Sequence, residues 1–340
     1  RSLSSAASDV YKRQDKYSKA AKQIVDTGLN CLGTTTTPEF GLTGTTESLR
    51  FGATCNPWNK AYSTGGSSGG SSALVAAGVI PIAHANDGAG SIRIPASCCG
   101  LVGLKASRGR IKDKEVPSYL PANILHDGVV TRSVRDTWAF HAEIEKNIPA
   151  TEFPPIGDIS ESFPKNLKIA VLTENCLGED SSAELVQATH DVARLCESLG
   201  HEVEMISNPF YKKFDEDFWL LWAHFGFLIR YSVGKELSSK FDHTQLEQWP
   251  KYLISRHWRN IHKVPVAFWR LRRFVSQYET FMQNFDILLT PTLGTTVPEL
   301  GFFGPEVSGQ EHWERINDFL PFTKYQNISG APAITLPCGT

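Results

Sequence analysis

The sequence lacks several features that mark whole classes of protein. It has no long apolar run, since the most apolar stretch, Phe218 to Ile229, is about a dozen residues and is interrupted by His224, whereas a membrane span needs about 20 apolar residues. It also lacks an excess of either charge, because 34 basic residues oppose 36 acidic ones and leave a net charge of -2. We therefore predict a buried helix at this stretch, and no membrane or nucleic acid as a partner.

Patterned cysteines and histidines are also missing. The seven cysteines are scattered and include no Cys-x-x-Cys pair, which argues against a disulfide framework and a thiolate zinc site. The ten histidines show no His-x-x-x-His or Glu-x-x-His pair that would place two ligands on one helix face. The sequence therefore predicts no metal, no cofactor and reduced thiols, as in a cytoplasmic protein.

Both ends of the sequence are abrupt. Residues 1–14, RSLSSAASDVYKRQ, contain no starting Met and no signal-peptide pattern, and they resemble translated adapter sequence. The chain stops in ISGAPAITLPCGT, just where a strand is expected to finish. The prediction is a single domain over 15–340, cut at both ends and preceded by 14 residues that are foreign to it.

Hydrophobic periodicity predicts alternating helices and strands. Parallel β-α-β organisation is expected where a buried strand, an amphipathic helix and an alternating strand follow one another. The expected elements are a helix at 16–28, a strand at 167–175, a helix at 182–199, a strand at 202–206, aromatic-rich helical stretches at 218–237 and 252–281, and a strand within FDILLTPTL at 285–293.

The segment from Ser63 to Ala77, STGGSSGGSSALVAA, is the most informative part of the chain. Its composition is typical of a flexible linker, but it runs into a helix start at Ala73 and a second cluster of small residues follows. Its glycine spacing fits neither of the common phosphate-binding motifs. A serine nucleophile instead needs a base and donors for an oxyanion. NDGAGS places small residues before Ser91, so backbone N–H groups can converge there.

The stretch GGSSGGSSALVAAGVIPIAHANDGAGSIRIPASCCGLVGLK resembles the signature of the amidase signature family of serine hydrolases. The 24-residue interval from Ser67 to Ser91 matches the interval between the two catalytic serines of that family. GTTTTPEFGLTGTTES and FTKYQNISGAPAITLP agree as well, so the resemblance covers about 16–337. HAND at His84 and GLVGLKASRGRI further resemble the branch that contains 6-aminohexanoate-cyclic-dimer hydrolases.

The resemblance implies an α/β amidase-signature fold, with a mixed central sheet covered by helices on both faces. It also implies a Ser–cis-Ser–Lys triad, in which Ser91 forms the acyl-enzyme and Ser67, after a cis peptide bond, passes the proton. The remaining site residues implied by the family are the oxyanion-hole residues Gly88, Ala89 and Gly90, together with the supporting residues Ser68, Asp87 and Arg93.

Two departures from the family pattern bear on activity. The family's lysine lies upstream in an apolar stretch, followed by Asp, and this chain has no such stretch; Lys105 lies on the wrong side of the motif. The chain as given is therefore expected to be inactive. Asn86 stands where Thr is usual and Ala89 where Gly is usual, and a positive φ at position 89 would penalise the alanine Cβ.

The function expected from the resemblance is hydrolysis of a small linear or cyclic amide to acid and amine. One alternative is the glutamine-hydrolysing subunit of an amidotransferase, and another is a non-catalytic scaffold with the same fold. Cys98 and Cys99 are interpreted as buried apolar residues. Seven aromatic residues are interpreted as lining helix-packing faces, with a minority lining an acyl pocket: Trp219, Trp222, Phe225, Phe227, Trp258, Phe268 and Trp269. A homodimer is the default for a soluble protein. The sequence does not name the substrate.

Overall fold

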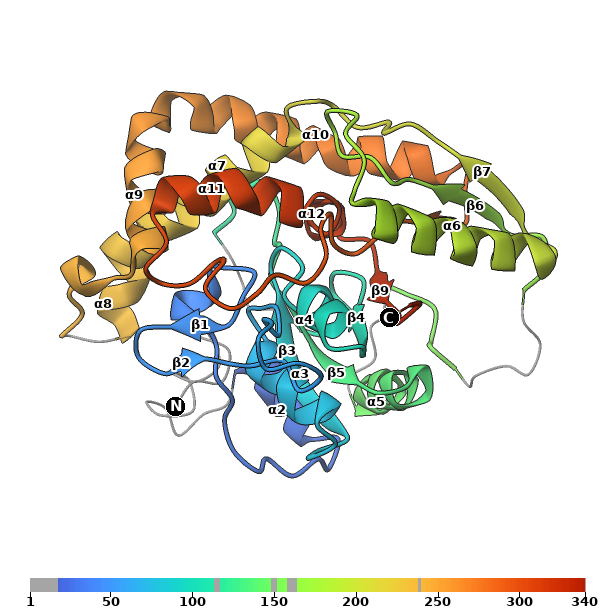
Figure 1. Cartoon of the computed structure of the whole chain (residues 1–340), viewed down its shortest axis with the longest axis horizontal. Coiled ribbons are helices and arrows are strands. Elements are labelled where there is room, and N and C mark those ends of the chain that lie inside the picture. The colour runs from blue at the N-terminus through green and yellow to red at the C-terminus, as the bar shows by residue number, and fades with distance from the viewer. Residues whose placement is uncertain (1–17, 113–116, 148–151, 158–163, 238–239, 340) are drawn as a thin grey trace.

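The computed structural model describes residues 18–112, 117–147, 152–157, 164–237 and 240–339. Figure 1 shows strands and short helices below a layer of long helices. All 14 N-terminal residues considered foreign to the domain lie outside the described residues, and so do the lysines at 12 and 16. No helix in the described ranges is long and apolar enough to cross a membrane.

One sheet is antiparallel. Its strands, in spatial order, are β3 (Ile82–Asp87), β5 (His126–Thr131), β4 (Val102–Lys105) and β9 (Ala333–Thr335). The register pairs Asp87 with His126 and Ile82 with Thr131. β3 therefore ends at the same edge of the sheet at which β5 begins, and the segment after Asp87 leaves from that edge.

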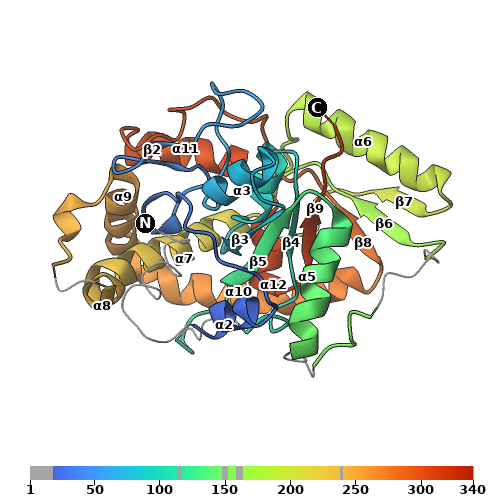
Figure 2. The ribbon, with the colours of Figure 1, turned by 90° about the horizontal axis from the view of Figure 1, so that it is seen from below.

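A second sheet is parallel. Its order is β7 (Glu202–Met205), β6 (Lys168–Val171) and β8 (Ile287–Leu289), and helix α6 (Ala183–Ser198) connects β6 to β7. This confirms the predicted β-α-β unit. The strands pair as two separate sheets, which Figure 2 shows side by side, with β9 next to β8. The hydroxyl of Thr335 in β9 lies 3.0 Å from that of Thr292, which follows β8. The predicted mixed α/β architecture is confirmed.

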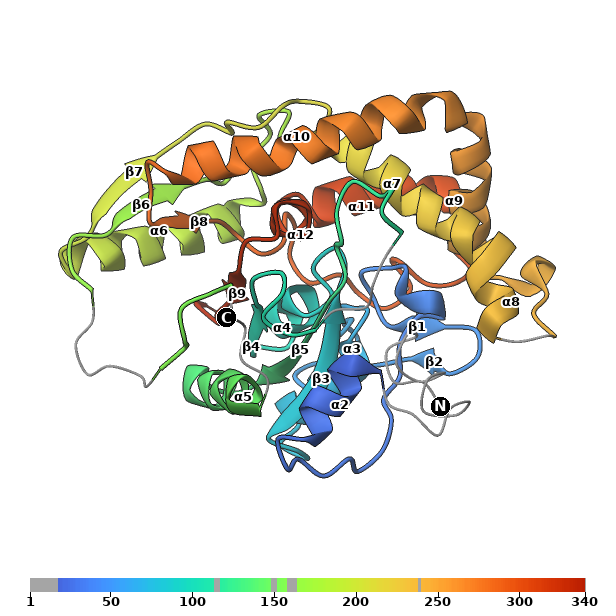
Figure 3. The same cartoon turned by 180° about the vertical axis from the view of Figure 1, so that it is seen from behind.

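Alternation along β5 sends neighbouring side chains to opposite faces of the sheet. Val129 packs with Ala20 of α2 (Lys19–Val25) and Phe140 of α5 (Val134–Asn147). Val130 faces the main core, on the side of α3 (Gly69–Ala76) and α4 (Arg93–Cys98). Helices therefore cover both faces, as Figure 3 shows from behind.

The layer of long helices carries most of the aromatic core. The predicted buried helix is α7, and the aromatic stretch at 252–281 is divided into two helices at Asn260. The helical elements after β7 are α7 (Phe214–Leu228), a π-helical turn (Ile229–Val233), α8 (Gly234–Leu237), α9 (Gln248–Arg259), α10 (Val264–Met282), α11 (Gly309–Phe319) and α12 (Lys324–Ser329). The remaining short elements are β1 (Glu47–Ser48), β2 (Gly52–Ala53), and 3₁₀ turns at Glu39–Gly41, His243–Gln245 and Ile261–Lys263.

The helix expected to start at Ala73 starts earlier, at Gly69, inside the glycine and serine segment. The reason is close packing. A Cβ at Gly69 would collide with the side chains of Thr46 and Thr64, and one at Gly70 would collide with Thr36. The glycines are therefore part of a tightly packed helix start, and the linker interpretation does not apply.

Candidate active site

Ser67 lies in a turn that is enclosed by the loop before β1. The peptide bond between Gly66 and Ser67 is cis, as the resemblance predicts. The Thr46 hydroxyl donates to the Gly65 carbonyl at 2.9 Å and accepts from the Gly69 N–H at 3.1 Å. A Cβ on Gly66 would collide with the backbone of Thr45. This turn therefore admits only glycine at position 66 and holds Ser67 at the start of α3.

Ser91 lies in the loop that joins β3 to α4, and the Asp87 carboxylate organises this loop from inside. Asp87 accepts hydrogen bonds from the N–H groups of Gly90 at 2.7 Å and Ile92 at 3.3 Å. Ser91 is 6% exposed and Ser67 is 4% exposed. Both serines are thus nearly enclosed, in a setting where bulk water is largely excluded.

The concern that Ala89 requires a positive φ is wrong. The positive φ, 120°, is at Gly90, and Ala89 is not among the positive-φ residues. A Cβ on Gly90 would lie 2.6 Å from the Thr323 hydroxyl oxygen. That hydroxyl donates to the Ala89 carbonyl at 2.6 Å. Position 90 therefore requires glycine, and the alanine at 89 costs nothing in backbone conformation.

A fully buried ion pair anchors the same loop. Arg93 donates from Nε to Asp87 Oδ2 at 3.0 Å and from Nη2 to Oδ1 at 3.1 Å, and Asn327 Nδ2 donates to Oδ1 at 2.9 Å. Burial alone would raise the pKa of Asp87, but the adjacent Arg93 guanidinium and Asn327 amide hold this pKa well below its usual range. Asp87 is thus a structural anion.

Helix α12 completes the anchor, and sequence reasoning missed most of its role. Arg93 also donates to Gln326 Oε1 at 3.1 Å and to Asn327 Oδ1 at 2.7 Å. The Asn327 amide donates to the Ile124 carbonyl at 3.0 Å, and its side chain is fully buried. Asn327 is therefore a structural residue of the anchor. The family-like stretch FTKYQNISG was the only sequence signal for Thr323 and Gln326.

Ser68 joins the two serine-bearing segments. Its hydroxyl lies 3.2 Å from the Asn86 nitrogen and 3.3 Å from the Asn86 oxygen, and the nearby Ser71 hydroxyl donates to the His84 carbonyl at 2.7 Å. The start of α3 is therefore tied to the end of β3. This brings the Ser67 turn and the Ser91 loop to the same edge of the sheet.

The loop offers fewer free donors than the resemblance implies. The Gly90 N–H already donates to Asp87, so it is not available for a substrate oxygen. The N–H groups of Gly88, Ala89 and Ser91 are left as candidates for an oxyanion hole.

Two lysines are fully buried in the described part of the chain, and both are engaged. Lys324 forms an ion pair with Asp215 at 2.7 Å. Lys105 donates to the Ala106 carbonyl at 2.9 Å. A triad base must be able to accept a proton, and an ion-paired lysine such as Lys324 does not meet that need.

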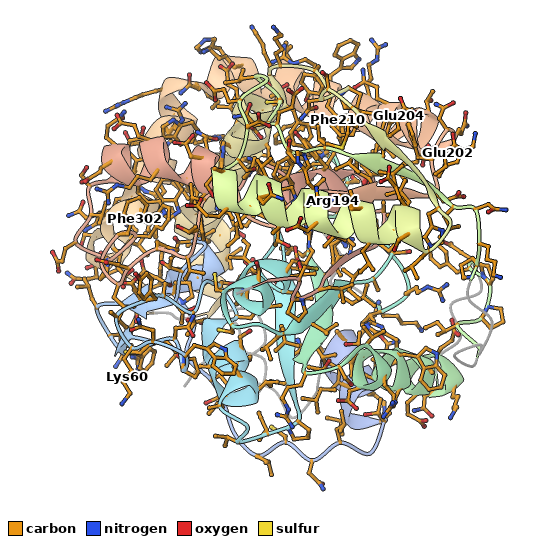
Figure 4. The ribbon with its side chains drawn as sticks, turned by 45° about the vertical axis from the view of Figure 1, so that its right-hand side comes forward. Lys60, Arg194, Glu202, Glu204, Phe210 and Phe302 are labelled. Carbon is orange, nitrogen blue, oxygen red and sulfur yellow. The ribbon has the colours of Figure 1, made fainter. Side chains whose placement is uncertain are left out.

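The two adjacent cysteines, the metal-ligating side chains and the surface grooves were also checked for a role in a site. Cys98 and Cys99 are buried, and burial raises the pKa of Cys99 to about 12, which favours the unreactive thiol. Within the described ranges no three His, Cys, Asp or Glu side chains are grouped so as to hold a metal ion. One groove of about 580 Å³ is lined in part by Phe210, and another of about 510 Å³ in part by Glu202 and Glu204 (Figure 4). Neither lining includes Ser67 or Ser91.

Comparison with known proteins shows which family has this fold and this site. Residues 3–340 match the family model described as Amidase. The chain belongs to the amidase family. AmiC of Mycobacterium tuberculosis, which is named an amidase, is 42% identical over 321 residues, covering 94% of this chain and 67% of the relative. The 6-aminohexanoate-cyclic-dimer hydrolase of Paenarthrobacter ureafaciens is 34% identical over 92% of this chain and 67% of the relative.

Solved structures agree with the fold of this amidase. A 6-aminohexanoate cyclic dimer hydrolase bound to its substrate superposes with a TM-score of 0.82 at 31% identity, covering 96% of this chain and 72% of that one. A bacterial aryl acylamidase of the amidase signature family gives a TM-score of 0.77 at 25% identity, covering 96% of this chain and 69% of that one. The amidase resemblance is therefore confirmed, and hydrolysis of amide bonds is the activity of this protein.

Proposed function

We propose that this amidase hydrolyses a small linear or cyclic carboxylic amide through an acyl-enzyme on Ser91. The observation that carries the proposal is the placement of two enclosed serines at the same end of β3, where Ser68 ties the Ser67 turn to Asn86 and Asp87 braces the loop of Ser91. A buried, rigid loop can present preorganised N–H groups to a developing oxyanion.

The reaction proceeds in two steps. The Ser91 oxygen attacks the amide carbonyl while its proton passes through the Ser67 hydroxyl to a base. The N–H groups of Gly88, Ala89 and Ser91 stabilise the negative oxygen of the tetrahedral intermediate. The C–N bond then breaks as the amine takes the proton back, and water releases the acid from Ser91 by the reverse proton path.

We further propose that the base is the lysine that the family carries upstream, in a segment that this chain lacks. Lys324 is held by Asp215 and Lys105 by a backbone carbonyl, which leaves neither as a free base. On this proposal the chain as given is inactive, and a form extended by its upstream-encoded residues is active. The roles of Ser68, Asp87 and Arg93 are to brace the two serine segments, since their contacts are with the protein backbone, with one another and with side chains of α12.

A panel of three amides tests the activity. The cyclic dimer of 6-aminohexanoate, an aryl amide and glutamine are incubated with the extended form and with its Ser91→Ala variant, and amine or ammonia release is measured. We expect release from the cyclic or aryl amide and none with the variant. Release from glutamine alone would favour the amidotransferase alternative. No release by a folded, extended protein would favour a non-catalytic scaffold and contradict the proposal.

The remaining proposals concern the protein as a whole. We propose that 15–340 forms one domain of a cytoplasmic homodimer that acts on a small molecule without a cofactor. All seven cysteines are free, which fits a reducing compartment. Cell fractionation and sedimentation velocity test the location and the dimer.

A further inference from the structure

The indole of Trp222 contacts the loop that carries Ser91 and also the loop that encloses the Ser67 turn. Trp222 lies on α7, is 5% exposed, and stacks on Phe218 with ring centroids 5.9 Å apart. Its six-membered ring lies against Gly88, because a Cβ on that glycine would be 3.2 Å from Trp222 Cη2 and 3.1 Å from Leu125 Cδ2. Gly88 carries one of the proposed oxyanion N–H groups.

The other end of the same indole reaches the segment that holds Ser67. Trp222 Nε1 donates to the Leu42 carbonyl at 3.0 Å. Three and four residues later the same loop supplies the Thr45 backbone that encloses Gly66 and the Thr46 hydroxyl that bonds to Gly65. One rigid ring system therefore spans the distance between the loop before Ser91 and the loop around Ser67.

A second indole shares only half of this arrangement. Trp249 of α9 donates to the same Leu42 carbonyl at 2.9 Å and is likewise 5% exposed. It stacks on His312 with ring centroids 4.1 Å apart, and it is not among the nearest neighbours of Gly88. The chain thus contains a matched pair of buried tryptophans with one acceptor, of which one also contacts the oxyanion loop.

We propose that Trp222 is a positioning residue that sets the separation of the Ser67 turn and the Ser91 loop. The inference rests on the proposed function. The physical argument is that proton relay and oxyanion stabilisation depend on geometry, and a misplacement of about 1 Å can cost about a hundredfold in rate. Trp222 holds the backbone of both loops by direct contact, and packed interiors do not deform freely.

Replacing each tryptophan by Phe in the extended protein tests the proposal. Both substitutions remove an N–H donor to the Leu42 carbonyl and shorten a buried ring. We expect Trp222→Phe to slow acylation of Ser91 by a fluorophosphonate probe by about tenfold or more and to lower kcat more than it raises KM. Trp249→Phe should change the acylation rate little. Equal slowing by the two variants would overturn the proposal and leave a purely structural role.

Gly88→Ala supplies a second, independent test. The φ of Gly88 is not positive, so the added Cβ acts only through its contacts with Trp222 and Leu125. We expect Gly88→Ala to slow acylation in the wild-type background and to have a smaller effect together with Trp222→Phe, because the shorter ring makes room. If the two substitutions slow acylation independently, so that their fold-changes multiply in the double variant, the contact between Trp222 and Gly88 does not act in this way. The unfolding midpoints of the same four proteins report the coupling without activity.

The two hypotheses fail in different ways. A wild-type extended protein that is folded but does not react at Ser91 contradicts the proposed function. If the wild-type protein reacts and both Trp222→Phe and Trp249→Phe are acylated at the wild-type rate, only the role of Trp222 is contradicted.

Discussion

Two buried regions of this amidase are stabilised in different ways. The loop from Asp87 to Arg93 is held by an ion pair and by hydrogen bonds from Asn327. The layer around α7 and α9 is held by aromatic packing, such as Trp219 against Trp249 at 6.4 Å between ring centroids. Hydrogen bonds and ion pairs demand particular atoms at particular places, whereas apolar packing tolerates other residues of similar volume. The difference predicts where substitutions are harmful.

The largest stability effect is expected from the polar region. Asp87→Asn leaves the buried Arg93 guanidinium without a counter-charge, and breaking a buried pair typically costs about 3–5 kcal/mol. Phe218→Leu in the aromatic region removes part of a buried apolar side chain and no charge, and it should cost about 1–2 kcal/mol. Urea unfolding of both variants measures the two free energies of unfolding. Equal costs would contradict the contrast between the regions.

The acid limb of stability gives a second readout of Asp87. Its pKa is lowered in the folded protein, so its contribution is present above the unfolded-state pKa and is lost as pH falls through the folded pKa. We expect wild-type stability to fall with acidification below about pH 4, with a shallower fall in Asp87→Asn. A parallel fall in both proteins would show that Asp87 does not contribute in this way.

A pair of glycines separates backbone strain from packing. Gly90 has a φ of 120° and a Cβ there would meet Thr323, whereas Gly78 has a φ of 74° and open space around it. Gly78→Ala should cost only the left-handed backbone penalty, about 1–2 kcal/mol. Gly90→Ala should cost clearly more and also slow acylation of Ser91. Thermal unfolding and probe labelling measure both, and equal losses in the two variants would mean that Thr323 moves away freely.

At neutral pH the smallest expected effect belongs to His312 in the aromatic region, because its pH-dependent contribution appears only on acidification. Burial, with a smaller contribution from Arg315, lowers the pKa of His312 to about 3. The unfolded chain therefore binds an extra proton below about pH 6.5, and stability is fully present above that pH and falls as pH drops toward the folded pKa. One such group contributes about 1.4 kcal/mol per pH unit in that window. His312→Phe keeps the ring against Trp249 and should flatten the slope of Tm between pH 6 and 4, by comparison with wild type. An unchanged slope would mean that groups other than His312 cause the loss of stability between pH 6 and 4.

How much could be predicted from the sequence follows from the same contrast. The serine interval and the cis bond at Ser67 came from the family resemblance, which the long glycine and serine motif carries. Sequence did not show that Gly90 rather than Ala89 takes the positive φ, or that the Gly90 N–H is already used by Asp87. Both depend on Thr323 and Asn327, which are more than 200 residues away along the chain.

The aromatic layer was predictable only as a set of helices. Helical periodicity located α7 and α10, but it does not say which ring faces which loop, because every face of a buried helix is apolar. The contact between Trp222 and Gly88 joins residues 134 positions apart and places α7 against the loop that follows β3. Substrate choice depends on such contacts, and this is why the motif names a reaction without naming a substrate.

Labelling with a fluorophosphonate probe tests the central claim most directly. The chain, its upstream-extended form and the Ser91→Ala variant of that form are labelled, and the modified residue is located by mass spectrometry. The account predicts labelling of the extended form at Ser91, none in the variant, and none in the chain as given. Labelling at a different serine, or undiminished labelling of the Ser91→Ala variant, would contradict it.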